Sequence, residues 1–303
     1  MTDVMNEDYK WVSQICPICE APPERFLGAR GGAAHRANLG VECQIWQCKK
    51  CKLIFPNPMP VPLRGVNQNY EIAADQYFEH HDLGSKCSSA SFMLKQATEL
   101  LGRTGSLLDV GCGRGEMLRT AREQGWNVIG VEPSRSFAVQ AAEYSGAEVR
   151  QNSLECCGFE PESFDAVVLS GVLEHLYTPN ETMAEIARIL KPGGLVFIDV
   201  PNEAGLYFRL GNLYQSMRGR SWVVNLAPTF SPYHVFGFSP YSLRALLAKH
   251  ALRPKLWRMY GGRSCLGSGE GFSGRVEKLA SSLVAGASNI GSLGNYIETW
   301  AGK

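Results

Sequence analysis

From residue 106 onward, short apolar runs alternate along the chain with stretches that are apolar on one side only. The runs at 106–110, 126–132, 147–151, 164–170 and 195–200 predict five strands, and the stretches between them predict helices. The run Phe164–Ser170 is continuous and rich in valine, which is typical of a strand buried on both faces. Strands and helices in this alternation predict an α/β domain around a mostly parallel sheet.

The flanking regions predict further elements. Apolar residues at helical spacing predict helices at 91–101, 239–252 and 275–287, while 255–260 and 295–301 predict two late strands, the last of them antiparallel and closing the sheet. Residues 191–194, Lys-Pro-Gly-Gly, predict the turn that ends the helix before the fifth strand. Four prolines between Pro56 and Pro62 predict a stiff linker.

Composition narrows the class of protein. The 303 residues are 45% hydrophobic and carry a formal net charge of +1, so the whole chain offers no field that would attract nucleic acid or an anionic membrane, although a local basic patch stays open. The N-terminal residues lack a basic head followed by an apolar core, and no apolar run approaches the roughly 20 residues that cross a bilayer. We therefore expect a cytoplasmic protein whose ten cysteines are thiols or metal ligands.

A glycine-rich loop joins the first predicted strand to the first predicted helix. Asp109 precedes Gly111, Gly113 and Gly115, a GxGxG spacing that differs from the GxGxxG of dinucleotide enzymes. Glycines at such a turn let a ligand approach the backbone next to the free N–H groups of a helix. The acidic residue suits the ammonium group of S-adenosylmethionine, and Glu132, at the end of the second strand, is placed to accept both ribose hydroxyls.

Four segments together resemble the class I S-adenosylmethionine-dependent methyltransferases. They are LLDVGCGRGEML (107–118), VIGVEPS (128–134), SFDAVVLSGVLEHLYTP (163–179) and LKPGGLVFIDVPN (190–202). The resemblance implies a Rossmann-like seven-stranded methyltransferase sheet over residues 105–303. It also implies that Asp109 and the three glycines hold the methionine part of the cofactor and that Glu132 holds the ribose.

The resemblance assigns the remaining cofactor contacts less directly. Pro133 and Ser134 would shape the adenine pocket, and Ser170, at the end of the fourth strand, belongs to the same set. Many family members have an acidic residue at the adenine edge, whereas this chain has Asn152-Ser153-Leu154, so Ser153 or the backbone N–H of Leu154 would serve there. Cys112 lies inside the loop as a small residue, and we do not interpret it as a nucleophile.

Two CxxC pairs near the N-terminus predict a zinc ribbon over residues 1–60. Cys16 and Cys19 are separated by 28 residues from Cys48 and Cys51, and four thiolates in two tight turns are typical of a closed structural zinc site. Unrelated cysteines or a redox pair are the alternatives. Residues 61–104 would form a helical linker and cofactor lid, to which Tyr70 and Tyr77 could belong.

Methyl transfer to a hydroxyl needs a base, and two histidines are candidates for it. His175 follows the fourth strand, where ligands of open α/β sheets bind. His234 lies in an expected substrate-side insertion at about 203–238. The alternative for each is a structural role, bonding the backbone at His175 and ordering the loop at His234. His250, within a helical pattern, is expected to be structural.

Three functions fit the sequence. The first is a methyltransferase for a small molecule, acting on a hydroxyl of a sugar or secondary metabolite. The second is an RNA base methyltransferase that grips RNA with the ribbon, but residues 1–60 hold seven Lys or Arg against six acidic residues, a balance that disfavours phosphate binding. The third is a non-catalytic interaction module that binds the cofactor.

Overall fold

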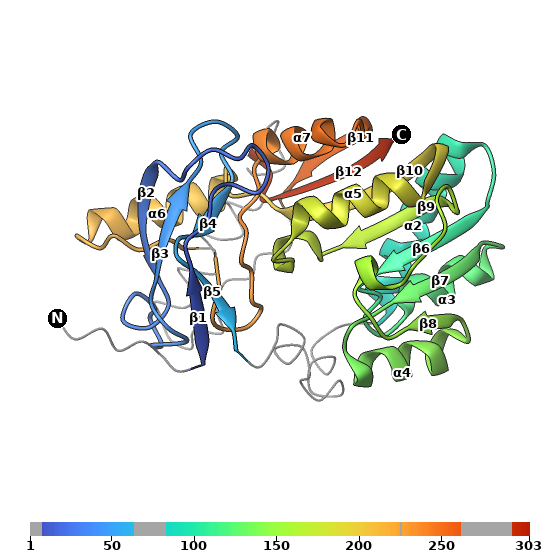
Figure 1. Ribbon diagram of the computed structural model, residues 1–303, viewed down its shortest axis with the longest axis horizontal. Helices are drawn as coiled ribbons and strands as arrows, with labels where there is room; N and C mark the ends of the chain where they lie inside the picture. The colour runs from blue at the N-terminus through green and yellow to red at the C-terminus, as the bar shows by residue number, and fades with distance from the viewer. Residues whose placement is uncertain (1–7, 64–82, 225, 262–292) are drawn as a thin grey trace.

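A seven-stranded sheet organises the C-terminal two thirds of the protein in the computed structural model (Figure 1). The structure describes residues 8–63, 83–224, 226–261 and 293–303. The strand order is β11-β12-β10-β9-β6-β7-β8, in which β6 to β10 are parallel and β12 is antiparallel to both neighbours. The strands are β6 (Ser106–Val110), β7 (Asn127–Val131), β8 (Glu148–Arg150), β9 (Phe164–Ser170), β10 (Leu190–Pro201), β11 (Arg253–Tyr260) and β12 (Tyr296–Gly302). The Rossmann-like sheet and its late antiparallel strand are therefore confirmed.

Helices cover both faces of this sheet because alternate residues of each buried strand point to opposite sides. Leu107, Ala166 and Phe197 pack with α2 (Leu83–Leu101) and α3 (Glu116–Glu123). Leu108 and Val167, each one residue away from a member of the first set, pack with α5 (Pro179–Ile189) and α7 (Pro240–Lys249) on the other face. The other α-helices of the described residues are α4 (Arg135–Ser145), which follows β7, and α6 (Leu206–Met217) in the insertion.

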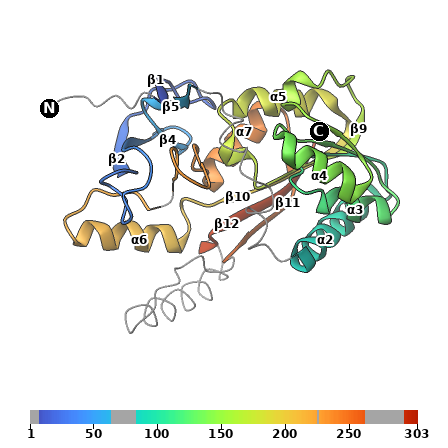
Figure 2. The ribbon, with the colours of Figure 1, turned by 90° about the horizontal axis from the view of Figure 1, so that it is seen from below.

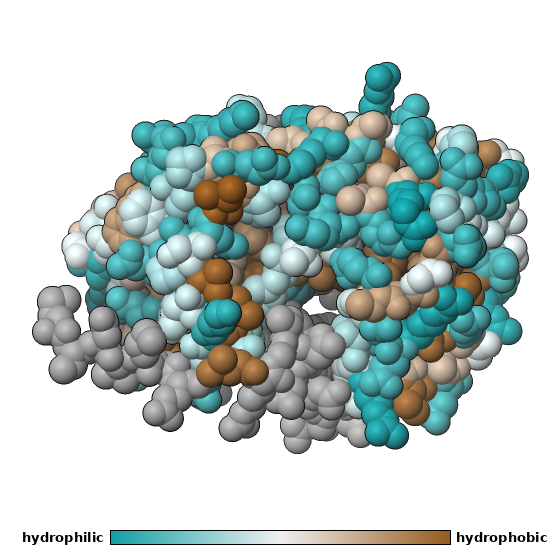
Figure 3. Space-filling view, in the orientation of Figure 1, coloured by the Kyte–Doolittle hydropathy of each residue, from teal (hydrophilic) through white to brown (hydrophobic). Residues whose placement is uncertain are grey.

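Residues 8–62 form what we call the cysteine module. Its strands are β1 (Tyr9–Val12), β2 (Arg25–Arg30), β3 (Cys43–Gln47), β4 (Ile54–Pro56) and β5 (Met59–Pro62). β2, β3 and β4 form one sheet, and β1 pairs with β5 in another. Apolar side chains gather on the face that carries β1 and β5 (Figure 3). Val12 in β1, Ile15 and Leu63 are exposed apolar residues in or next to these strands along the chain.

Two predictions about turns and linkers are wrong. The proline-rich segment forms β4 and β5 rather than a linker, because prolines are tolerated where a strand's N–H groups need no ladder partner, as in these short strands of small sheets. Residues 191–194 belong to β10, which begins at Leu190 and bulges between Leu190 and Leu195. The bulge lets the strand follow α5 without a separate turn. Tyr70, Tyr77 and the helix predicted at 275–287 lie outside the described residues.

The cysteine module packs on the insertion that follows β10. Ala29 bridges to Trp222 and Ile54 to Gly237, and Figure 2 shows α6 running along the module near β2. Cys16, Leu53 and Phe55 belong to the same apolar cluster as Phe236 and the α5–α7 side of the sheet. The module thus shares its core with the rest of the chain. Across the described part of the chain, no helix is both long and apolar enough to cross a membrane.

Candidate functional site

The carboxyl ends of β6, β7 and β9 open into a cavity of about 400 Å³. This is where ligands of open α/β sheets bind, and the volume lies within the range of small-molecule sites. The lining comes from all three strand ends, from α2, and from the insertion. Its members are Lys86, Val110, Gly111, Gly113, Val131, Glu132, Pro133, Phe137, Asn152, Ser153, Leu154, Glu155, Ser170, Gly171, Val172, His175, Leu176, Tyr177, Thr178, Thr182, Ser231, Pro232 and Tyr233.

The glycine loop forms one wall of this cavity. Gly111 has a φ of 67°, and a Cβ at this position would lie 2.7 Å from the Val172 side chain, so only glycine fits there. The N–H of Gly111 donates to the Val131 carbonyl at 2.8 Å, which ties the loop to β7. The loop then leads through Gly115 into α3, which begins at Glu116.

Glu132 is buried at the end of β7 and faces the loop. Its two carboxylate oxygens accept hydrogen bonds from the N–H groups of Gly113 and Ser134, each at 3.0 Å. Burial raises the pKa of Glu132 to about 7, against the lowering effect of these two bonds. Each carboxylate oxygen keeps a further lone pair, so the group fits the two hydroxyls of a ribose.

Several ionisable side chains lie close to Asp109, the residue that precedes the glycine loop. Asp109 is fully buried, and burial together with the charges of Glu116 and Glu132 raises its pKa well above the usual range, while Lys86 of α2 acts in the opposite direction. Arg114 forms an ion pair with Glu116 at 2.9 Å. Among the described residues that line the cavity, Lys86 is the one with a side-chain ammonium group.

The structure separates the predicted cofactor residues into two groups. Gly111, Gly113, Glu132, Pro133, Ser153, Leu154 and Ser170 line the cavity, whereas Asp109, Cys112, Gly115 and Ser134 lie behind its wall. The buried Cys112 side chain packs against Gly130 under β7, Gly115 approaches Ala141 of α4, and Ser134 caps α4 by accepting the N–H of Phe137. These four residues shape the wall that the first group presents.

His175, which lines the cavity, lies together with a second histidine, His234. The rings of His175 and His234 meet edge to face with centroids 4.7 Å apart, and of the two only His175 lines the cavity. Burial lowers the pKa of His175 to about 4 and that of His234 to about 3. Both imidazoles are therefore neutral near pH 7.

Glu174 accompanies this histidine pair. Its Oε1 lies 3.9 Å from Nε2 of His234, and burial raises its pKa to about 8. The Glu174 backbone carbonyl accepts from the N–H groups of Val235 and Phe236, at 2.9 and 3.1 Å. These bonds fasten the His234 loop to the turn that carries His175.

The cysteine module holds the same loop from the outside. Ile54 and Gly237 exchange two backbone hydrogen bonds of 3.0 and 2.8 Å, and Val41 exchanges two with the Thr229 hydroxyl. Tyr177, which lines the cavity, donates to the Pro60 carbonyl at 3.1 Å. The module therefore supports Tyr177 in the cavity wall and the loop that carries His234.

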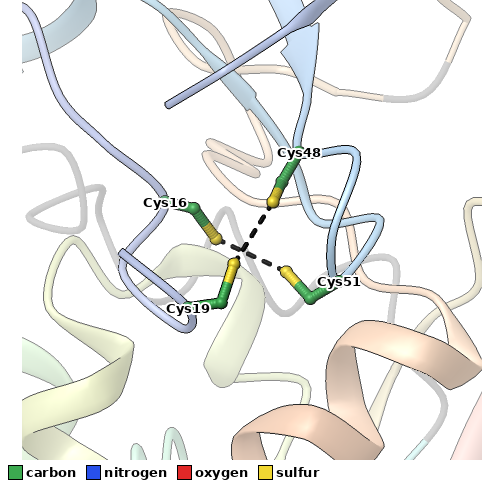
Figure 4. Close-up of side chains that lie close together, drawn as sticks. All are labelled: Cys16, Cys19, Cys48 and Cys51. Atoms are coloured by element: carbon green, nitrogen blue, oxygen red, sulfur yellow. Dashed lines mark hydrogen bonds between the residues drawn. The ribbon is translucent and has the colours of Figure 1, made fainter. Parts of the chain in front are cut away.

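The four predicted metal ligands converge in the cysteine module (Figure 4). The Sγ atoms of Cys16 and Cys51 lie 3.4 Å apart and those of Cys19 and Cys48 lie 3.3 Å apart, with all four atoms within 4.8 Å of one another. A tetrahedral zinc ion with Zn–S bonds of about 2.3 Å separates its sulfurs by about 3.8 Å. The cluster is compatible with a closed zinc site.

Both cysteine turns have the same local form. The N–H of Glu20 donates to Cys16, and that of Lys52 donates to Cys48, each at 2.9 Å. Glu20 and Lys52 each adopt a positive φ, of 57° and 66°, immediately after the second cysteine of the pair. This repetition aims the two pairs of thiols at one point.

A family model described as a methyltransferase domain matches residues 79–253, more than half of the chain. The chain belongs to this methyltransferase family. The ubiquinone biosynthesis O-methyltransferase of Aliivibrio fischeri is 28% identical over 175 residues, which cover 54% of this chain and 70% of that protein. The mitochondrial protein of the same name from Homo sapiens is 28% identical over 155 residues, which cover 48% of this chain and 41% of that protein.

Solved structures show the same fold for this class I S-adenosylmethionine-dependent methyltransferase. A SAM-dependent methyltransferase from Archaeoglobus fulgidus superposes with a TM-score of 0.50 at 20% identity, over 72% of this chain and 94% of that one. A SAM-dependent methyltransferase from Leishmania major superposes with a TM-score of 0.50 at 12% identity, over 78% of this chain and 81% of that one. At these identities the likeness concerns the fold alone.

The sequence did not point to several residues of the methyltransferase cavity. Lys86 reaches it from α2, Tyr177 follows the histidine turn, and Tyr233 enters from the insertion with a positive φ of 64°. The signal for Tyr177 and Tyr233 was present, since each lies within two residues of a candidate histidine. Lys86 lay outside every motif.

Proposed function

We propose that this methyltransferase transfers a methyl group to a hydroxyl of a small molecule, with a sugar or a secondary metabolite as the acceptor class. The observation that supports it is a single cavity that joins the glycine loop and Glu132 to a neutral histidine and two tyrosines. The ubiquinone biosynthesis relatives are named O-methyltransferases, which supports a hydroxyl acceptor.

The donor half of the cavity would hold S-adenosylmethionine, which supplies an electrophilic methyl group on a sulfonium centre. In this arrangement Glu132 accepts the ribose hydroxyls, and the backbone at Gly111 and Gly113 lies against the methionine part. Ser153 and the N–H of Leu154 meet the adenine, beside Pro133 and Ser170. Lys86, which lines the cavity, would face the cofactor's carboxylate.

The acceptor half would position the hydroxyl and remove its proton. His175 is neutral and lines the cavity, so its imidazole can accept a proton, and His234 packs edge to face against it. An imidazole whose pKa is lowered to about 4 is a weak base. Within the proposed acceptor class this favours a secondary metabolite with an acidic hydroxyl, such as an enol or a phenol-like group, over a sugar. The rings of Tyr177 and Tyr233 and the ring of Pro232 supply apolar surface for a flat acceptor.

We also propose that the cysteine cluster binds one structural zinc ion. Four cysteine ligands leave no open coordination position, so this site would stabilise the fold and take no part in methyl transfer. Its contribution would reach the cavity through Ile54 and Tyr177, whose bonds to Gly237 and Pro60 support the acceptor wall.

A mass-spectrometric screen tests the proposed reaction. The purified protein is incubated with S-adenosylmethionine and a panel of phenols, enols and sugars, and products are searched for a gain of one methyl group together with S-adenosylhomocysteine. His175→Asn is expected to lower turnover about 100-fold or more. His250→Asn is the matched control, because His250 does not line the cavity and instead forms a hydrogen bond with the Asn180 side chain. Methylation only at nitrogen or carbon, or full turnover by His175→Asn, would contradict the proposal.

A further inference from the structure

Helix α6 presents an apolar stripe to the surroundings. Leu210, Leu213, Tyr214 and Met217 follow the spacing i, i+3, i+4, i+7, which places them on one side of the helix. All four are exposed, from 42% for Leu210 to 76% for Met217. A stripe of large apolar side chains in this position marks an interaction surface.

The opposite side of α6 already has its partners within the chain. Phe208 and Gln215 are buried, and Gly211 lies against the Val224 side chain. The Asn212 side chain accepts the N–H of Val224 at 2.9 Å. The stripe is therefore the outward side of a fixed helix.

The charged residues on α6 and directly after it are all basic. Residues 204–260 contain eight Lys or Arg and no Asp or Glu, although the whole chain has a net charge of only +1. Arg209 and Arg218 are exposed on α6, and Arg218 donates to the Tyr214 hydroxyl at 3.3 Å. Arg220 follows, with its guanidinium 4.4 Å from the Trp222 ring. The apolar stripe thus has a basic rim.

We propose that α6 docks this methyltransferase onto an anionic membrane surface. An apolar stripe with arginines beside it is the pattern of helices that lie in the lipid interface, where the apolar side chains enter the acyl boundary and the cations meet the headgroups. A symmetric contact with a second copy would bring the arginines of two α6 helices together without any carboxylate from residues 204–260. A nucleic acid would leave the four apolar side chains without contacts.

Vesicle sedimentation of the full-length protein tests this docking. Vesicles of phosphatidylcholine with phosphatidylglycerol are compared with vesicles of phosphatidylcholine alone, at low and high salt. Leu213→Gln with Met217→Gln is expected to weaken binding to the anionic vesicles about tenfold or more. The matched control is Ile15→Gln with Leu63→Gln, two apolar positions of 53% and 61% exposure that follow β1 and β5 along the chain. Figure 2 places β1 and β5 on the side of the cysteine module away from α6.

Wild-type protein should sediment with the anionic vesicles, less at high salt, and the control should match it. Circular dichroism melting checks that both double variants stay folded. The proposal is overturned if the wild type stays in the supernatant, if both vesicle types bind it equally, or if the α6 variant binds like the control. Two other outcomes also overturn the proposal. One is a dimer, detected by light scattering, that the α6 substitutions dissociate. The other is RNA binding that is tighter than vesicle binding and that the α6 substitutions leave unchanged. Because the acceptor is not used, these results are independent of the proposed reaction.

Discussion

Replacing Glu174 with glutamine should change how the stability of the protein depends on pH. The carboxyl is fully buried, and its Oε2 has no hydrogen-bond partner among the described residues. Burial raises the pKa from 4.5 to about 8, so the fold favours the protonated acid. That contribution to stability is complete below pH 4.5 and is lost as the pH rises through about 8.

The size of the effect follows from the two pKa values. The difference between about 8 and 4.5, at 1.36 kcal/mol for each pH unit, gives about 5 kcal/mol at high pH. Glu174→Gln keeps the shape and remains neutral, so the variant should match the wild type near pH 4.5. Between pH 5.5 and 7.5 its advantage in unfolding free energy should grow by about 2.5 kcal/mol.

Urea unfolding at pH 5.5, 6.5 and 7.5 measures this advantage. Glu181→Gln, an exposed glutamate on the neighbouring α5, is the control and should track the wild type at each pH. A constant difference between Glu174→Gln and the wild type across this range would refute the reasoning, because only a carboxyl with a raised pKa produces a growing difference.

Three further predictions concern the cofactor, the metal and the contact between the module and the insertion. Glu132→Ala should weaken S-adenosylmethionine binding in calorimetry about 100-fold, because two hydrogen bonds to a charged group are lost; unchanged affinity would remove the ribose assignment. Elemental analysis should find one zinc ion per chain. Removal of the zinc by a chelator should speed hydrogen exchange at residues 226–238 while cofactor binding persists. Unaltered exchange would show that the cysteine module does not support the acceptor wall. Gly28→Ala should lower the melting temperature more than Gly102→Ala. Gly28 has a φ of 143° and its Cβ would lie 2.2 Å from the Ser221 carbonyl oxygen, whereas Gly102, with a φ of 73°, has open space; equal shifts would argue against this contact.

The sheet could be predicted because its signals are local. Phe164–Ser170 is recognisable from its own residues, and the turn from β6 into α3 is set by glycines such as Gly111, whose conformation no other residue adopts as readily. Glu132 could be placed for the same reason, since a parallel strand delivers its last residue to the edge where ligands bind.

The remainder depends on contacts between distant segments. Nothing near Pro56 in the sequence shows that β4 pairs with β3 or that Ile54 bonds Gly237, because those partners are chosen by packing across the fold. Lys86 likewise enters the cavity only because α2 packs beside α3. The pairing of His234 with His175 required the insertion to return to the end of β9, which no periodicity encodes.

The position of β12 between β10 and β11 has a consequence for biosynthesis. β11 ends at Tyr260, and its partner strand begins only at Tyr296, so a nascent chain carries β10 and β11 for dozens of residues before the strand that joins them exists. Until then both strands present open edges, which invite pairing with other chains. Synthesis in the cell should therefore benefit from chaperones that shield these edges, and a release of the chain before Gly302 should yield aggregates rather than a smaller folded enzyme.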